Sequence, residues 1–271
     1  MKKRSLVAAI AMLIVSAIVL TSSTYAWFAS SANASVTGIN ATVSNNNGSI
    51  SVAPTGTNAK AAVKDIYKTA ITGNDYEGLC TNLNPVSMYI NGSTPQFNKV
   101  NYNTETFSSF GAATENADYL VYQFKVKASN AADASAARNV GMTTSFTTNT
   151  GAFCNGIVAV TAGGTTTYYF YNGGGSYEAL IDMTNTTITD TNGDAIVGSG
   201  DANLVAASDL LASSSFTGVT TGPASIPVLS SIAAGAEAEA TVSVYVWAEG
   251  QDSGCTGNVN AEQAYFTINL A

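Results

Sequence analysis

The sequence predicts an all-β protein built as a sandwich of two packed sheets, and three observations support this fold class. Tyr, Val, Ile and Thr, which favour strands, recur in short runs separated by Gly and Asn. Several of these runs alternate apolar and polar residues, as half-buried strands do. Only 10% of the residues are charged, yet 13 Tyr, 10 Phe and 2 Trp are available for a core, so wholesale disorder is not expected.

Strand-like runs follow one another along the chain, at 86–90, 118–129, 138–149, 156–175, 186–198, 238–250 and 261–270. The run 118–129 alternates most clearly, and its predicted buried face consists of Leu120, Tyr122, Phe124 and Val126. In 238–250, a second predicted face of Val242, Val244 and Val246 opposes Thr241, Ser243, Tyr245 and Trp247.

Turn signals separate these runs. Gly163-Gly164 predicts a hairpin within 156–175, and Asn192-Gly193 predicts a type I′ turn within 186–198. Only 57–71 and 200–213 favour helices, the second with Asp201 as its N-cap.

The domain organisation is simple. No repeat of about 20–50 residues indicates a solenoid or propeller, and no charged or Pro-rich linker interrupts the chain after residue 58. We therefore expect residues 51–271 to form one β-sandwich domain. The number of strands is compatible with a jelly roll and with an immunoglobulin-like sandwich.

The first 26 residues have the three parts of a secretory signal, which we expect to form a helix. Lys2, Lys3 and Arg4 precede an apolar run from Leu6 to Leu20, and Ala26 offers a small residue for cleavage. The run is shorter than the roughly 20 residues that span a bilayer comfortably. We therefore expect residues 1–26 to be a cleaved signal peptide and the mature protein to be secreted, at the cell surface or extracellular.

Two other interpretations of this region stay open. An uncleaved anchor would place Tyr25, Trp27 and Phe28 as an aromatic belt at the membrane surface. A type IV-like pilin would be cut before the apolar run, but the chain lacks the Gly/Ala-Phe-Thr-Leu-Ile-Glu pattern of those proteins. With cleavage after Ala26, an extended segment of residues 27–50 forms the new N-terminus.

Composition excludes several classes of function. The chain contains no His, so it cannot build a Ser-His-Asp triad, a Cys-His pair or an HExxH zinc site, and we expect no enzyme activity. Its net charge is −8, and losing Lys2, Lys3 and Arg4 with the signal makes the mature chain more acidic. Such a chain is a poor ligand for nucleic acid and for anionic membranes.

The chain has three cysteines, Cys80, Cys154 and Cys255. Each lies within two residues of a Gly, so we expect each near a loop. In an exported chain we expect one disulfide and one leftover thiol, but the sequence does not choose among the three pairings. A metal site is disfavoured because these residues are far apart in sequence. A catalytic thiol would lack its His partner.

Acidic residues suggest two weaker sites. Asp190, Asn192 and Asp194 occupy EF-hand-like positions, but Ala195 replaces the required Gly, so we favour a hairpin over a calcium site and expect no cofactor. Glu249 and Asp252 could form a carboxylate pair for glycoside hydrolysis, but hydrogen bonding at a strand end explains them more simply.

Two short motifs carry a resemblance to a known family. The signal end, Thr24, Tyr25, Ala26, Trp27 and Phe28, resembles that of the TasA/camelysin family of secreted fibre proteins of Gram-positive bacteria. Near the C-terminus, a Trp/Val-x-Glu-Gly-x-Asp-x-x-Cys element of related surface proteins is matched by Glu249, Gly250, Asp252 and Cys255. The resemblance implies a jelly-roll fold and a role in fibres of a biofilm matrix.

These observations lead to a structural hypothesis. The chain would assemble into extracellular fibres or a surface matrix with copies of itself, and with other matrix or cell-wall components. The N-terminal segment would add as a strand to the next subunit and fill apolar pockets there with Trp27, Phe28, Val36 and Ile39. The alternative is a monomeric adhesin or carbohydrate-binding module that uses the tyrosines of 168–177 as a stacking platform.

Overall fold

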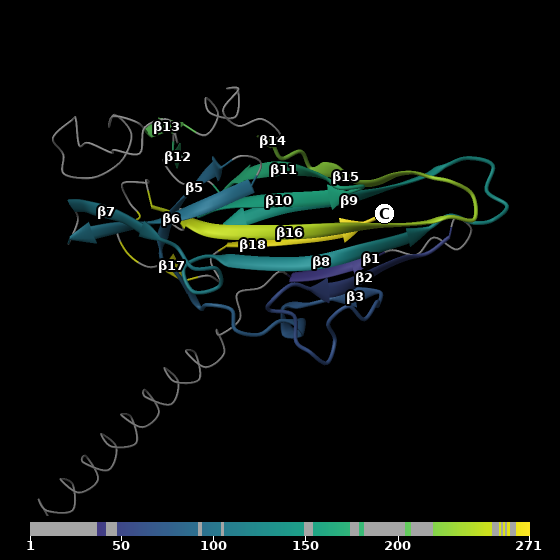
Figure 1. Ribbon diagram of the computed structural model, residues 1–271, viewed down its shortest axis with the longest axis horizontal. Coiled ribbons are helices and arrows are strands. Elements are labelled where there is room, and N and C mark those ends of the chain that lie inside the picture. Colours follow the sequence, from purple (N-terminus) through teal and green to yellow (C-terminus); the bar gives the residue numbers. More distant parts are fainter. Residues whose placement is uncertain are drawn as a thin grey trace, which may run out of the picture. The chain divides into compact units, whose positions relative to one another are not determined.

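A computed structural model describes most of the chain after residue 36 (Figure 1). The described residues are 37–41, 48–91, 94–103, 106–148, 154–173, 179–181, 204–206, 219–250, 255, 257, 259–260 and 264–271. All of them lie in one compact unit, residues 34–271. The predicted signal peptide therefore lies outside the described residues. Among the described residues, no helix has the length and apolar character needed to cross a membrane.

The described residues confirm an all-β fold with two main sheets. The first has five strands, in the order β15 (Ser225–Ile232), β9 (Arg138–Thr148), β18 (Ala264–Leu270), β1 (Thr37–Ala41) and β3 (Ala70–Ile71). The second has nine. Seven follow the order β14 (Val219–Thr221), β11 (Thr165–Asn172), β10 (Cys154–Ala162), β16 (Glu237–Glu249), β5 (Pro85–Asn91), β6 (Thr94–Asn103) and β7 (Thr106–Ala112). Of the other two, β8 (Leu120–Ser129) pairs with β16, on the edge that also holds β5, and β2 (Ile50–Thr55) pairs with β8.

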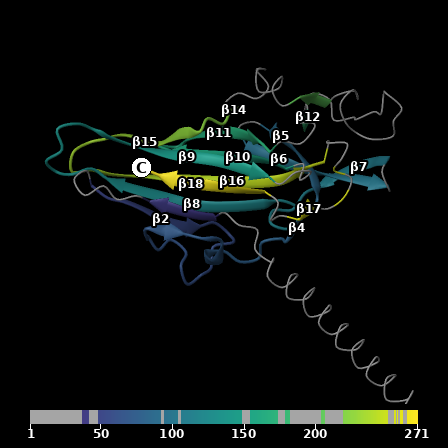
Figure 2. The same ribbon diagram turned by 180° about the vertical axis from the view of Figure 1, so that it is seen from behind.

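Smaller elements complete the described part of the fold. Two short pairs stand apart from the main sheets: β12 (Ala179–Ile181) with β13 (Leu204–Ala206), and β17 (Val259–Asn260) with β4 (Asn82–Leu83). A 3-10 helix, η1, spans Gly73–Asp75. Figures 1 and 2 show β1, β2 and β3 together along one side of the two sheets.

The main core lies between the two sheets, because each sheet turns its apolar face toward the other. Phe124 and Val244 of the nine-stranded sheet and Met142 and Phe266 of the five-stranded sheet are all completely buried there. The alternation of 118–129 is confirmed, since the inner face of β8 buries Leu120, Tyr122, Phe124 and Val126.

A second, smaller core lies on the outer face of the nine-stranded sheet. The β5–β6 hairpin covers this face with Val86, Met88 and Phe97. Beneath it, Trp247 is completely buried, and its ring lies 5.3 Å from Phe97 in an edge-on contact. Both faces of β16 are therefore buried near its C-terminal end.

Two predicted turns have different outcomes. The hairpin at Gly163-Gly164 is confirmed, because β10 and β11 pair from Asn155↔Asn172 to Ala162↔Thr165. Both glycines have positive φ, 57° and 81°, as a type I′ turn requires. The turn predicted at Asn192-Gly193 lies outside the described residues.

The helix predicted over 57–71 is wrong. One turn forms where the Lys64 amide donates to the Lys60 carbonyl at 2.9 Å, and Asp65, with φ of 59°, ends it. The neighbouring backbone pairs instead with strands, since Lys68 bonds to Val52 in both directions. A second helix is predicted over 200–213. The structure describes only residues 204–206 of this range, and they form the strand β13.

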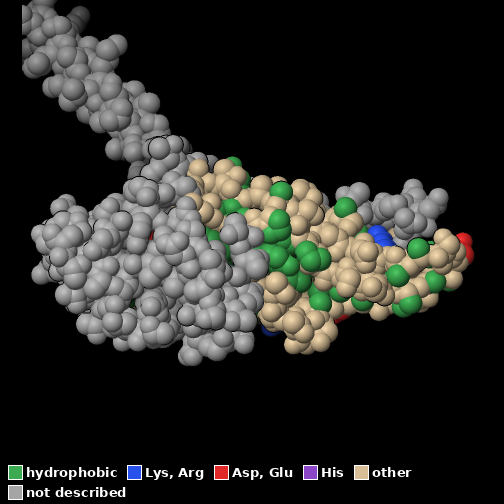
Figure 3. Space-filling model, turned by 90° about the horizontal axis from the view of Figure 1, so that it is seen from above, with side chains coloured by type: hydrophobic (Ala, Val, Ile, Leu, Met, Phe, Trp, Pro, Cys, Tyr) green, Lys and Arg blue, Asp and Glu red, His purple; other side chains and the backbone are tan. Residues whose placement is uncertain are grey.

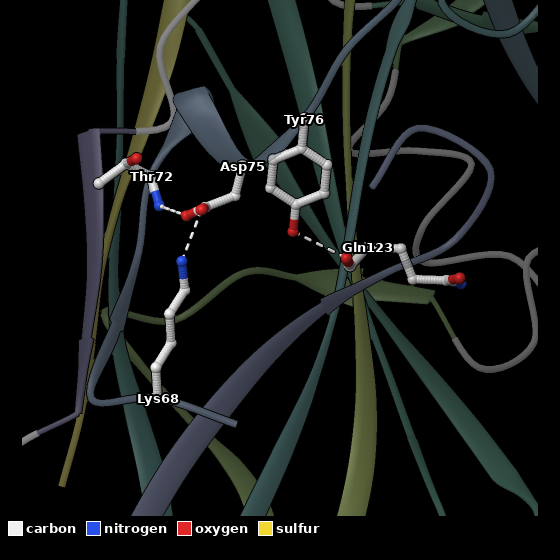
Figure 4. Close-up of polar contacts among 5 residues, drawn as sticks. All are labelled: Lys68, Thr72, Asp75, Tyr76 and Gln123. Atoms are coloured by element: carbon white, nitrogen blue, oxygen red, sulfur yellow. Dashed lines mark hydrogen bonds and ion pairs between the residues drawn. The ribbon is translucent and has the colours of Figure 1, made fainter. Parts of the chain in front are cut away.

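The loop that replaces the first helix is anchored by side chains (Figure 4). The Asp75 carboxylate accepts a hydrogen bond from the Thr72 amide at 2.7 Å and forms an ion pair with Lys68. The phenol of Tyr76 donates to the Gln123 carbonyl of β8 at 2.7 Å. These contacts fasten the loop to β8 of the nine-stranded sheet.

Candidate functional site

Of the N-terminal segment 27–50, the structure describes residues 37–41 and 48–50, and Ile50 begins β2. Residues 37–41 form β1, which lies inside the chain's own five-stranded sheet. It runs parallel to the C-terminal strand β18 and antiparallel to β3. Ile39 points into the main core and is only 1% exposed. The structure therefore places this predicted assembly residue in a core position of its own subunit, whereas Trp27, Phe28 and Val36 lie outside the described residues.

The backbone contacts of β1 are few. It pairs with β18 at Thr37↔Thr267, Asn40↔Asn269 and Ala41↔Leu270, with a register shift between the first two pairs. On its other side it pairs with the two residues of β3, at Ile39↔Ile71 and Asn40↔Ala70. We call the place between β18 and β3 the β1 slot.

The predicted motif at 249–255 is a buried corner. Glu249 is 1% exposed, at the end of β16. Its Oε1 accepts a hydrogen bond from Ser87 Oγ at 2.6 Å, and its Oε2 accepts from Trp247 Nε1 at 3.0 Å and from Asn155 Nδ2 at 3.2 Å. The carboxylate thus ties the ends of β5, β10 and β16 together.

The corner needs glycine at position 250, because there is no room for a side chain. Its amide donates to the Val86 carbonyl at 2.8 Å. A Cβ on Gly250 would lie 2.5 Å from the Val100 side chain and 3.0 Å from the Pro85 backbone. Asp252, the second acid of the predicted pair, lies outside the described residues. The corner as described therefore has a structural role and holds one carboxylate.

The cysteines are thiols in the structure. Cys154 and Cys255 are buried in the main core, while Cys80 is half-buried beside it. Burial raises the pKa of Cys80 to about 11 and that of Cys154 to about 12, so neither thiol is a thiolate near neutral pH. The disulfide pairing stays a prediction.

The tyrosine run of β11 serves packing. Tyr168 and Phe170 are buried in the outer core, and Tyr171 is buried on the inner side. The Tyr171 ring makes an edge contact with Phe266 at 5.3 Å, and its phenol donates to the Pro223 carbonyl at 2.9 Å. These rings do not form an exposed stacking platform.

The calcium candidates Asp190, Asn192 and Asp194 lie outside the described residues. Among the residues that the structure describes, no group of three or more acidic or Cys side chains could hold a metal ion. The structure also has a polar pocket that the sequence did not predict. Residues 55–58, Tyr76, Glu115 and Tyr245 line it. No sequence signal marks it, because segments far apart in the chain contribute to it.

The chain matches no protein-family model, no curated protein and no solved structure.

Proposed function

We propose that the protein is a secreted structural subunit that self-assembles into extracellular fibres or a surface matrix through its N-terminal segment, residues 27–50. The observation that carries this proposal is the placement of β1. A short strand near the chain start, with weak backbone pairing, occupies a position beside the C-terminal strand. In the assembled form, β1 of one copy would fill the β1 slot of the next.

Such an exchange is favoured by physical chemistry. The same contacts that bury Ile39 within one subunit would form between subunits, so exchange loses little free energy. Main-chain hydrogen bonds to β18 and β3 would give affinity, and the pocket for Ile39 would set the register. Trp27, Phe28 and Val36 would extend the contact on the acceptor subunit.

The opposite edge of the five-stranded sheet, β15, has no part in the proposed assembly. Natural sheet edges are commonly protected by charged residues, yet β15, the outer strand opposite β3, contains none. On the face shown in Figure 3, hydrophobic side chains gather over the described part and charged ones are few. Pro227 and irregular pairing with β9 protect β15 instead.

The remaining parts of the proposal follow from the sequence. They are a jelly-roll topology, relationship to the TasA/camelysin family, cleavage after Ala26, and other matrix or cell-wall components as further partners. Of the platform that the adhesin alternative uses, the tyrosines of β11 pack in or against the two cores, and Tyr177 lies outside the described residues.

Deleting residues 27–43 from the mature protein tests the proposal. We expect electron microscopy to show no filaments, while circular dichroism shows a folded β monomer. A labelled peptide of residues 27–43 should bind this variant, whose slot is empty, more tightly than the intact protein.

The matched control is Ser230→Asp, which adds a charge to the exposed edge of β15. It should leave filaments unchanged. Filaments that survive the deletion but are lost in Ser230→Asp would show that β15, not β1, joins the subunits.

A further inference from the structure

The outer face of the nine-stranded sheet carries a small polar pocket that the proposed assembly does not use. Its volume is about 170 Å³. The chain after β2 supplies Thr57 and Asn58, β8 supplies Gln123, β16 supplies Tyr245, and Glu115 comes from the turn before β8. The pocket is smaller than the ~300 Å³ typical of sites for drug-sized ligands, so it suits a ligand with one ring.

One side of the pocket presents a positioned carboxylate. Glu115 is exposed, and its Oε1 accepts from Asn116 Nδ2 at 3.1 Å and from Thr57 Oγ1 at 3.4 Å. Asn116 is buried and has φ of 59°, and its Oδ1 accepts from the Val121 amide at 2.9 Å. The second carboxylate oxygen can accept hydrogen bonds from a ligand.

Another side is formed by Asn58, whose side-chain NH2 group is buried. Asn58 Nδ2 has no hydrogen-bond partner among the described residues. Asn58 Oδ1 lies 3.4 Å from Thr57 Oγ1, which donates its single proton either here or to Glu115. Because Asn58 Nδ2 is closed off from solvent, a ligand cannot use it, and the donor that this part of the pocket offers is the Tyr245 phenol.

The aromatic walls are held firmly. Tyr76 makes an edge contact with Tyr122 at 5.3 Å, and the loop that carries it is anchored by the contacts in Figure 4. Tyr245 stacks near Phe97 at 5.9 Å. Burial raises the pKa of Tyr245 to about 12, so its phenol keeps its proton and can donate a hydrogen bond at neutral pH.

A glycine keeps the pocket open. Gly56 lines the pocket and has φ of 85°, which L side chains rarely adopt. A Cβ there would lie 3.1 Å from Gln123 Cβ and Oε1. Gln123 in turn donates through Nε2 to Ser243 Oγ at 2.9 Å, which leaves its Oε1 facing Gly56 as an acceptor.

We propose that this pocket binds one neutral hexopyranose ring, as found at the end of a glycan. Sugar hydroxyls both donate and accept, so they can donate to Glu115 and Gln123 and also accept from the Tyr245 phenol. The C–H face of the ring can pack on Tyr245. A cation such as a lysine ammonium would suit Glu115, but it carries no acceptor for the Tyr245 phenol.

Saturation-transfer NMR on the intact mature protein tests this inference. The probes are the methyl glycosides of glucose, galactose, mannose and N-acetylglucosamine, with tetramethylammonium as the cationic comparison. We expect at least one glycoside to bind with a millimolar dissociation constant and tetramethylammonium not to bind. Binding should be the same for monomers and filaments, so it does not depend on the proposed assembly.

Two variants localise the binding. Glu115→Gln should weaken glycoside binding about tenfold or more, because it removes a charge-assisted hydrogen bond. Tyr245→Phe keeps the ring and should weaken it less. Glu237→Gln, the same change at an exposed carboxylate paired with Lys127, should leave binding unchanged, and thermal unfolding should confirm that all three variants are folded.

Three results would overturn the inference. The first is that no glycoside of the panel binds at millimolar concentration. The second is binding that Glu115→Gln leaves unchanged, which would place the sugar elsewhere. The third is displacement of a bound glycoside by tetramethylammonium, which would identify the pocket as a cation site.

Discussion

The centre of the nine-stranded sheet and the β1 slot of the five-stranded sheet bury their apolar residues equally well but hold their strands very differently. β16 pairs with β8 without interruption from Glu237↔Ser129 to Val246↔Leu120, and with β10 along its other edge. β1 has a broken register with β18, and β3 is only two residues long. Phe124 and Ile39 illustrate the two cases, since both are buried in the same core.

This difference shows that burial alone does not measure how tightly a segment is held. A strand in the middle of a long ladder can leave only if the whole sheet opens, whereas a marginal strand can detach by local unfolding. A substitution in a marginal strand can lower the free energy of unfolding only by the amount that holds this strand in place, because beyond that amount the strand detaches and the rest of the fold remains. The following predictions test this comparison, in order of decreasing expected effect.

Phe124→Ala should have the largest effect. Phe124 is completely buried in β8, between β16 and β2, and the sheet cannot close the resulting cavity. We expect a loss of about 3–5 kcal/mol in the free energy of unfolding, measured by chemical denaturation. Lys125→Ala, at the next position of β8, is the control and should cost far less.

Glu249→Gln should have the second-largest effect on stability, because it weakens the corner where β5, β10 and β16 meet. The amide offers one acceptor oxygen to the hydrogen bonds from Ser87, Trp247 and Asn155, so at least one buried donor loses its partner. We expect a cost of about 1–3 kcal/mol. Equal stability of this variant and the unaltered protein would show that the corner does not contribute.

Ile39→Ala tests directly how weakly β1 is held in its sheet. A buried Ile normally costs up to about 5 kcal/mol on this change, but we expect no more than about 2 kcal/mol because β1 can detach. Hydrogen exchange should also show faster exchange for amides of β1 than for those of β8 and β16. A loss as large as that of Phe124→Ala would contradict the comparison.

The smallest effect concerns Asp118, at the turn that leads into β8. Burial opposes its ionisation, but hydrogen bonds from Lys99, the Thr114 amide and Asn84 outweigh burial, so the pKa of Asp118 lies below its ordinary value. Because the folded-state pKa is depressed, this stabilisation is present above the ordinary Asp pKa and is lost as pH falls through the folded-state value.

Asp118→Asn should therefore destabilise the protein at neutral pH by about 1 kcal/mol, the net value of a hydrogen bond, and flatten the acid side of its stability curve. Thermal unfolding between neutral and acidic pH measures this change. An acid side as steep as that of the unaltered protein would show that other carboxylates control it.

Much of the fold could be predicted, and β8 shows why. Its inner residues alternate with polar ones, and this alternation is a local property of the chain. Trp247 shows the limit: it lies on the opposite face from Val246, so alternation predicts only that it faces away from the main core. That face is buried by the β5–β6 hairpin, a contact between segments well over a hundred residues apart.

The candidate sites show the same division. Glu249 was recognisable as a residue at a strand end, but its three donors come from β5, β10 and β16 and depend on how those strands align. The loop 57–71 has residues that favour a helix, yet pairing with Val52 of β2 and anchoring through Asp75 and Tyr76 decided its shape. Local preference is weak compared with such contacts.

By itself, the sequence determined the all-β class, the strands with clear alternation, the Gly163-Gly164 turn and the absence of His-based chemistry. These depend on residue types and on spacing along the chain. Only the tertiary structure decided that β1 lies beside β18, that the β11 tyrosines are buried, and that Asn58, Glu115 and Tyr245 line one pocket. The physical reason is that these features arise from pairing between distant segments, which no local pattern specifies.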